Sequence, residues 1–362
     1  MNSTIFLFIM LVPVFIPFIF IPYWTRKTES FGISIPEDAF YSTDIRNMRK
    51  KYAWINGILA LLFTVIFYVV SSGHSEHFIS IVFPILIFGY IAASFGVYLF
   101  FHKKMQDVKN THKDWVGKSQ LIVVDTKFRN QKLTYSNLWM LIPFTLSIFT
   151  LAIVLFHYQD IPERFPMQYD FNGEVTRWAD KSYRSVLLIP IIQIYMTMLF
   201  LFINTIISKA KQQVSAENPE ESLRQNIIFR KRWSLFTIIM GTGLVLMLTL
   251  QPLSFIYPIS HQVLLIAPLV FVIGVCAASI ILSITTGQGG SRIGKAAGGK
   301  LIDRDDDRFW KLGMFYFNKN DPAIFLEKRF GIGWTNNWAH PISWVITIGI
   351  ILIIVGLQWF LG

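Results

Sequence analysis

The sequence predicts an all-α integral membrane protein with eight transmembrane helices and a small cytoplasmic β-containing subdomain. Three observations support this fold class. The 362 residues are 53% hydrophobic and 15% charged, whereas soluble domains carry about 25% charged residues. The hydrophobic residues form uncharged runs of about 20, the length of a helix that crosses a bilayer. Lys and Arg collect in alternate connecting segments, as they do in membrane proteins of fixed orientation.

The expected spans are the runs that contain no Asp, Glu, Lys or Arg. The first run is too long for the core of a signal peptide, so we expect a retained helix. Short connectors between the second and third spans, and between the sixth and seventh, predict antiparallel helical hairpins. The eight spans lie at about residues 3–24, 53–71, 78–101, 137–158, 185–208, 234–257, 262–286 and 342–361.

The distribution of Lys and Arg predicts the orientation. The segments 25–52, 102–136, 209–233 and 287–341 together hold 29 of these residues, and the alternate segments hold 4. Because basic residues favour cytoplasmic loops, both termini and the segment 159–184 are expected outside. The same bias accounts for the net charge of +11 without nucleic acid, so the expected partner is the lipid bilayer.

Spans and loops together divide the chain into five regions. Residues 1–136 form an N-terminal membrane region with three spans and a basic cytoplasmic loop, and 137–208 form a two-span domain with the outer loop 159–184. Residues 209–286 hold a cytoplasmic helix and a two-span hairpin. A glycine-rich linker and a cytoplasmic domain occupy 287–341, and the last span occupies 342–362.

Three β-branched or aromatic runs, 120–128, 313–318 and 323–328, predict strands. The second and third flank the turn-forming residues 319–322. They are therefore expected to pair with each other as a hairpin.

The segment 160–182 is the candidate binding surface. The dipeptide Asn172-Gly173 predicts a tight turn, and connecting segments that carry aromatic and charged residues are frequent binding sites. The alternative is a folded cap that closes the bundle. The candidate residues are Asp170, Asn172, Gly173, Trp178, Asp180 and Lys181.

Gln193 and Asn204 are the candidate intramembrane polar residues. They lie eleven residues apart, about three helical turns, and so share one face of the fifth span. They can line a polar groove or form hydrogen bonds between helices. No span carries an ionisable residue well inside it, which disfavours ion-coupled transport.

Motifs for enzyme, metal and cofactor chemistry are incomplete. The run 289–296 imitates a phosphate-binding loop, but Ala296 stands where a hydroxyl must bind magnesium; glycine there predicts a flexible linker. Asp303, Asp305 and Asp307 lack the later glycine and glutamate of a calcium loop. The single cysteine, Cys276, cannot form an intramolecular disulfide. We therefore expect no enzyme activity, no cofactor and no metal.

The spacing P-x-x-x-P-x-x-Y-D-x-x-G-x-x-x-x-W-x-x-K in 162–181, with its flanking spans, resembles the short membrane domain that begins SdpI-like toxin-immunity proteins. The resemblance covers about 140–208 and departs at Gln168, where the family usually has His. Residues 303–341 resemble a second uncharacterised domain of larger relatives, and 31–54 resemble a cytoplasmic segment of these relatives. The resemblance implies a bacterial plasma membrane.

These observations predict a non-enzymatic envelope sensor or a peptide-toxin immunity-type protein. It would meet an extracellular peptide or another membrane protein through 159–184. The alternative is a permease or a partner subunit of an exporter. A groove lined by Gln193 and Asn204 would favour transport, and a closely packed bundle would favour the sensor.

Overall fold

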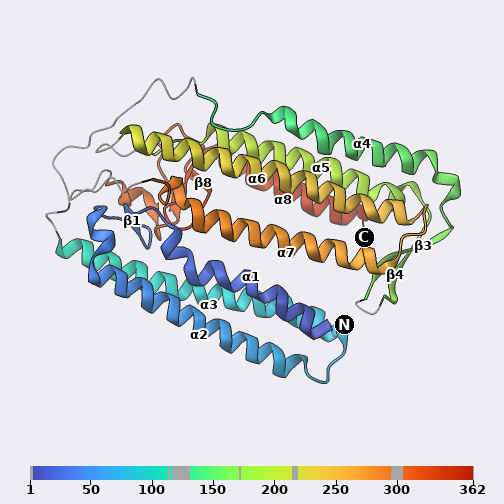
Figure 1. Ribbon diagram of the computed structural model, residues 1–362, viewed down its shortest axis with the longest axis horizontal. Coiled ribbons are helices and arrows are strands. Elements are labelled where there is room, and N and C mark those ends of the chain that lie inside the picture. The colour runs from blue at the N-terminus through green and yellow to red at the C-terminus, as the bar shows by residue number, and fades with distance from the viewer. Residues whose placement is uncertain are drawn as a thin grey trace.

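The computed structural model describes residues 3–112, 115, 131–170, 173–213, 219–294 and 305–361. In this part of the chain eight α-helices run along the long axis of the molecule (Figure 1). Every predicted span coincides with one of them. Their bounds are α1 Ser3–Trp24, α2 Thr43–Ser71, α3 Glu76–Thr111, α4 Leu141–Phe156, α5 Tyr183–Lys209, α6 Pro219–Ser254, α7 His261–Thr286 and α8 Pro341–Leu361.

Six helical segments of the described ranges are long and apolar enough to cross a membrane, which indicates a membrane protein. Within the described residues, α1 and α8 contribute only the shorter apolar segments Met10–Trp24 and Pro341–Gly356. The count of eight spans therefore stays a prediction. The six segments are Thr43–Ser71, His77–Thr111, Asn137–Phe156, Tyr183–Lys209, Pro219–Ser254 and His261–Gly290.

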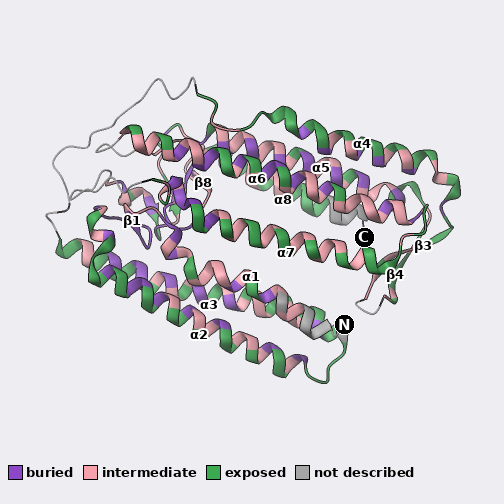
Figure 2. Cartoon of the chain, in the orientation of Figure 1, coloured by how far each residue is buried: buried purple, intermediate pink, exposed green. Residues whose placement is uncertain are grey.

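The helices form two groups joined by α7. Helices α1, α2 and α3 pack together, with the Phe15 and Tyr90 ring centroids 4.6 Å apart. Helices α4, α5 and α6 form the second group, and α7 packs against both α6 and α1. Buried and exposed residues alternate along the helices (Figure 2), and many of the exposed residues are large and apolar. Apolar outer surfaces are what a hydrocarbon environment requires.

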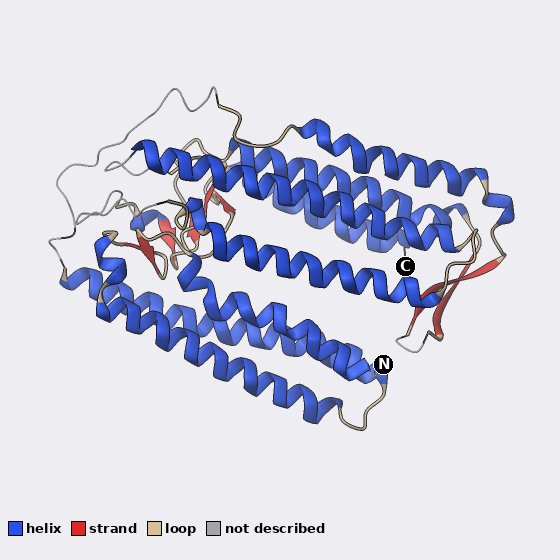
Figure 3. Cartoon of the chain, in the orientation of Figure 1, coloured by secondary structure: helices blue, strands red, loops and turns tan. Residues whose placement is uncertain are grey.

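In the part of the chain that the structure describes, four short antiparallel strand pairs lie at the two ends of the helices (Figure 3). We call the end with the β3–β4 pair the hairpin end and the opposite end the domain end. The pairs are β1 Glu29–Ser30 with β2 Ile33–Ser34, β3 Arg164–Tyr169 with β4 Val175–Asp180, β5 Trp310–Lys311 with β6 Phe315–Tyr316, and β7 Phe325–Glu327 with β8 Trp334–Asn336.

The connections divide between these ends as the Lys and Arg count predicts. The connector of α2 with α3, the connector of α6 with α7 and both chain ends lie at the hairpin end (Figure 1). The described parts of the four basic segments lie at the domain end. The chain thus separates the connections that are rich in Lys and Arg from those that hold few of these residues.

The predicted hairpin between 313–318 and 323–328 is wrong. Strands form in both runs, but β6 pairs back with β5 and β7 pairs forward with β8. Leu312 and Gly313 have φ values of 53° and 67°, the left-handed conformation of a tight hairpin turn, and so they close β5 on β6. The predicted strand 120–128 lies outside the described residues.

Candidate functional site

One face of the β3–β4 hairpin is packed on the helices. Phe165 of β3 lies against Phe255, which follows α6, with ring centroids 4.3 Å apart. The Gln251 side chain of α6 donates a hydrogen bond of 2.6 Å to the Met167 carbonyl. These contacts hold the hairpin on the ends of α4, α5 and α6. The other residues buried in this cluster are Val154, Ile161 and Val186.

Asp170 and Gly173 shape the turn of the hairpin. The Asp170 carboxylate accepts a hydrogen bond of 2.7 Å from the Glu174 amide. Gly173 has a φ of 90°, and a Cβ placed there would lie 2.4 Å from Cδ2 of His261, the first residue of α7. The predicted turn therefore needs glycine at 173 for its conformation and for space. Its neighbour Asn172 lies outside the described residues.

The other face of the hairpin is exposed and charged. Trp178 is 51% exposed and lies opposite Pro166 in the strand register. Arg164 and Asp180 form an exposed ion pair of 3.3 Å across the strands. Tryptophan and arginine are enriched in protein interfaces, and the rim of an interface is polar. Further exposed charged residues on the hairpin are Glu163, Glu174 and Arg177.

Lys181 has a different environment from Asp180, although the two are adjacent. Its ammonium donates to the Gln159 carbonyl at 3.3 Å and lies 5.1 Å from the centre of the Tyr158 ring. The side chain is only 9% exposed. Lys181 therefore anchors the base of the hairpin, while Trp178 and Asp180 face solvent.

Gln193 and Asn204 lie between helices. The Gln193 amide donates to Thr249 Oγ1 of α6 at 2.9 Å. The Asn204 amide donates to Asn137 at 2.8 Å, and its oxygen accepts from Ser234 of α6 at 2.6 Å. Both side chains are buried, and both bond to α6, so they share one face of α5 as predicted. They join helices and do not line an open groove.

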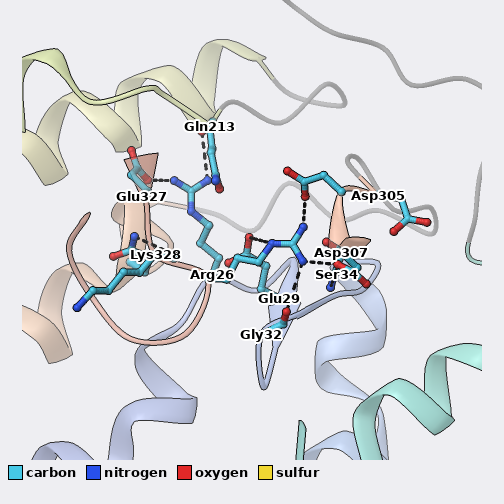
Figure 4. Close-up of polar contacts among 12 residues, drawn as sticks. Arg26, Glu29, Gly32, Ser34, Gln213, Asp305, Asp307, Glu327 and Lys328 are labelled. Carbon is cyan, nitrogen blue, oxygen red and sulfur yellow. Dashed lines mark hydrogen bonds and ion pairs between the residues drawn. The ribbon is translucent and has the colours of Figure 1, made fainter. Parts of the chain in front are cut away.

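A buried group of charges at the domain end is not predicted by the sequence pattern. Glu327 of β7 has no exposed side-chain surface, and it pairs with Arg26, which follows α1 (Figure 4). Arg230 of α6, also fully buried, lies 3.3 Å from the same carboxylate. The Asn226 amide donates to it at 2.7 Å. We call Arg26, Asn226, Arg230 and Glu327 the Glu327 cluster.

Arg230 also holds the end of α5. Its Nη1 donates to the Ile207 carbonyl at 2.7 Å and its Nη2 to the Ala210 carbonyl at 2.9 Å. Ile207 lies in the last turn of α5 and Ala210 directly follows the helix, so neither carbonyl has an intrahelical donor. One guanidinium therefore connects α5, α6 and β7.

A second buried group surrounds Arg329, which follows β7. Arg329 pairs with Asp306 and Asp307. Lys109 of α3 reaches Asp305 at 2.8 Å and Asp307 at 2.6 Å. The acidic run 305–307, visible in part in Figure 4, thus attaches the first helical group to the domain end.

A third contact joins α5 to the same domain. Lys211 lies 2.6 Å from Asp321, whose carboxylate also accepts a hydrogen bond of 2.9 Å from the Tyr316 hydroxyl. Burial by itself raises the pKa of Asp321, but hydrogen bonds from Lys211, the Ala323 amide and Tyr316 hold that pKa below its ordinary value. Asp321 is therefore ionised at neutral pH. Within the described ranges, no three His, Cys, Asp or Glu side chains are grouped as metal ligands.

The helices, hairpin and domain define a class: a multi-pass helical membrane protein with a β-hairpin at one end and a small β-containing domain at the other. Two family models match parts of the chain. A domain of unknown function, DUF1648, matches residues 145–194, and a family of unknown function, DUF5808, matches residues 319–344. No curated protein and no solved structure matches the chain.

The two matches fall on two of the three segments for which the sequence predicts a resemblance, and the third, 31–54, stays a prediction. The first covers most of α4, the hairpin and the first half of α5, and the second covers β7, β8 and the start of α8. Two uncharacterised domains are therefore confirmed. The link to SdpI-like proteins stays a prediction.

Proposed function

We propose that the protein is a non-enzymatic sensor or immunity-type protein of a bacterial plasma membrane. It binds an extracellular peptide through the exposed face of the β3–β4 hairpin. The observation that supports this proposal is the position of α5. One helix is bonded to the hairpin at its first residues and to the Glu327 cluster at its last.

The first connection is short and directional. Ser182 caps α5 by accepting a hydrogen bond of 3.1 Å from the Ser185 amide, and the Ser185 hydroxyl donates to the Asp180 carbonyl at 2.7 Å. Asp180 is the last residue of β4. A ligand that moves the hairpin would therefore move the beginning of α5.

The second connection couples that movement to the Glu327 cluster. Arg230 holds both the last carbonyls of α5 and Glu327 of the domain. Helix shifts of about 1–2 Å are a common form of signal transmission between packed helices. A shift of this size along α5 would break its bonds to Arg230 and change how the end of α5 sits on the domain end, where a partner would bind.

The orientation follows from the charges. We place the hairpin end outside and the domain end, with its many Lys and Arg residues, in the cytoplasm. Both chain ends then lie outside, and the hairpin meets extracellular molecules.

The orientation is tested by single cysteines in a Cys276→Ser background. Cysteines at the exposed positions Ser75 and Ser260 are expected to react with a membrane-impermeant thiol reagent added to intact cells. Cysteines at the exposed positions Asn110 and Asn320 are expected to react only after the cells are lysed. Labelling of Asn110 in intact cells, with Ser75 protected, would reverse the orientation.

The alternative, a permease or exporter subunit, is less well supported. Its expected polar groove would use Gln193 and Asn204, and both side chains are buried in hydrogen bonds to α6. The closely packed polar residues favour the sensor.

The binding proposal is tested by changing the exposed face of the hairpin. The Trp178→Ser, Asp180→Asn double variant is expected to accumulate normally, because both side chains are exposed on the same face and exposed substitutions change stability by about 0.5 kcal/mol or less. Truncation of an interface tryptophan costs about 2 kcal/mol of binding, or about 30-fold. The measurement is survival during challenge with extracellular peptides, alongside the amount of protein in the membrane.

Tyr257→Ser is the control, since Tyr257 is an exposed aromatic residue at the same end but outside the hairpin. A benzophenone side chain placed at 178 should also crosslink to the peptide in cells, and one at 257 should not. If the double variant protects fully and no crosslink forms at 178, the hairpin is a folded cap that closes the bundle, and the binding proposal is rejected.

A further inference from the structure

A shallow groove lies between α2 and α3 near the domain end. Its volume is about 400 Å³, and it is lined by Lys51, Trp54, Ile55, Phe100, Phe101 and Lys104. The two lysines lie just beyond the uncharged spans 53–71 and 78–101. The groove therefore extends from the edge of the expected hydrocarbon region to the polar interface.

Among the described residues, none covers the apolar part of the groove. Trp54 is 74% exposed and Phe100 is 62% exposed, while Phe101 is buried beneath them against Tyr52. Tryptophan is enriched at the depth of lipid headgroups. At this depth an exposed aromatic surface faces lipid, and an acyl chain is the apolar molecule available to cover it.

The mouth of the groove is positively charged. Lys51 and Lys104 are exposed, and among the described residues neither forms an ion pair. The nearest carboxylate along α3 is Asp107, three residues beyond Lys104. The neighbouring Arg49 is buried and donates to the Phe40 carbonyl at 2.7 Å, so its charge is held away from the groove. Two ammonium groups beside an apolar floor match an anionic lipid headgroup with its chain.

We propose that this groove is a binding site for an anionic phospholipid. The phosphate lies between Lys51 and Lys104, and an acyl chain lies along Trp54, Ile55 and Phe100. Each lysine near the membrane surface favours an anionic lipid about fivefold. Together the two lysines give a preference over a zwitterionic lipid on the order of 25-fold.

The test uses Trp54 as the reporter. The full-length protein is placed in nanodiscs of phosphatidylcholine that contain a small fraction of brominated phosphatidylglycerol or, in parallel, brominated phosphatidylcholine. Quenching by bromine requires contact, and the signal of Trp54 is the difference between the parent and Trp54→Phe. Brominated phosphatidylglycerol is expected to quench this signal at a mole fraction about 25-fold lower than brominated phosphatidylcholine does.

The Lys51→Gln, Lys104→Gln double variant is expected to lose this preference. Lys50→Gln with Lys103→Gln is the matched control, because these exposed residues neighbour the groove lysines but do not line the groove. Equal quenching by the two lipids would overturn the proposal. An equal loss in the control would do the same, since it would show general surface charge instead of a site. Relief of quenching by inorganic phosphate would show that the lysines bind phosphate without the lipid chain, and would also reject it.

Discussion

Glu327→Gln is expected to destabilise the protein by about 3–5 kcal/mol, the usual cost of removing one partner from a buried ion pair. The glutamine keeps the size of the side chain and can still accept the hydrogen bond from Asn226. It removes the negative charge that faces both Arg26 and Arg230 inside the protein. Two guanidinium groups would then remain close together without that carboxylate.

The measurement is the fraction of detergent-solubilised protein that stays monodisperse after heating. A loss of 3–5 kcal/mol should lower the midpoint on the order of 10 °C. Glu220→Gln is the control, because Glu220 is an exposed glutamate in the first turn of α6. If both variants lose their monodisperse protein at the same temperature, the Glu327 cluster does not hold the domain end together.

The sequence predicts the helices well because each span is a local property. An uncharged run of about 20 residues can be recognised as a transmembrane helix without any information from the rest of the chain. The turn at Gly173 is predictable for the same reason, since its signal is contained in two adjacent residues. The separation of the connections into two ends follows from counting Lys and Arg.

The Glu327 cluster is not predictable in this way because its members are far apart in sequence. Arg26 and Glu327 are separated by 301 positions, and Arg230 and Glu327 by 97. In the sequence both arginines look like ordinary basic residues of cytoplasmic loops. Only the fold shows that Arg230 is buried and that both arginines pair with Glu327.

The prediction of strand pairing at the domain end is wrong for a related reason. Residues 319–322 have the composition of a hairpin turn, but Asp321 bonds to Lys211 at the end of α5. The Asn337 side chain donates to the carbonyls of Asn318 and Asp321, at 2.8 Å and 3.1 Å. These long-range bonds fix the conformation of residues 318–321. With that conformation β7 pairs with β8 and not with β6.

The glycine-rich segment after α7 also differs from the flexible linker that its composition predicts. Gln288 is buried, and its amide donates to the carbonyls of Lys328 and Gly333 at 3.1 Å and 3.0 Å. Residues 287–294 thus dock on α6 and on the domain, whereas Lys295 and Ala296 lie outside the described residues. Glycine in this segment allows the backbone to approach α6 closely, in addition to allowing conformations that other residues rarely adopt.

Gly290→Ala is the second substitution with a large expected effect, about 3–5 kcal/mol of destabilisation. Gly290 has a φ of 81°, and a Cβ there would lie 2.3 Å from the Gln225 carbonyl oxygen of α6. The left-handed conformation costs a non-glycine residue about 1–3 kcal/mol. The overlap with helix backbone adds a cost of similar size, because a helical carbonyl cannot rotate away as a side chain can.

Gly333→Ala separates these two costs. Gly333 has a φ of 107°, and nothing lies within 4 Å of a Cβ placed there, so this variant should show the conformational cost alone. In the same heating assay, Gly290→Ala is expected to lose its monodisperse form several degrees below Gly333→Ala. Equal midpoints for the two variants would mean that the segment can move off α6 at little cost. In that case residues 287–294 would behave as the free linker, and the domain end would depend on the buried ion pairs for its attachment.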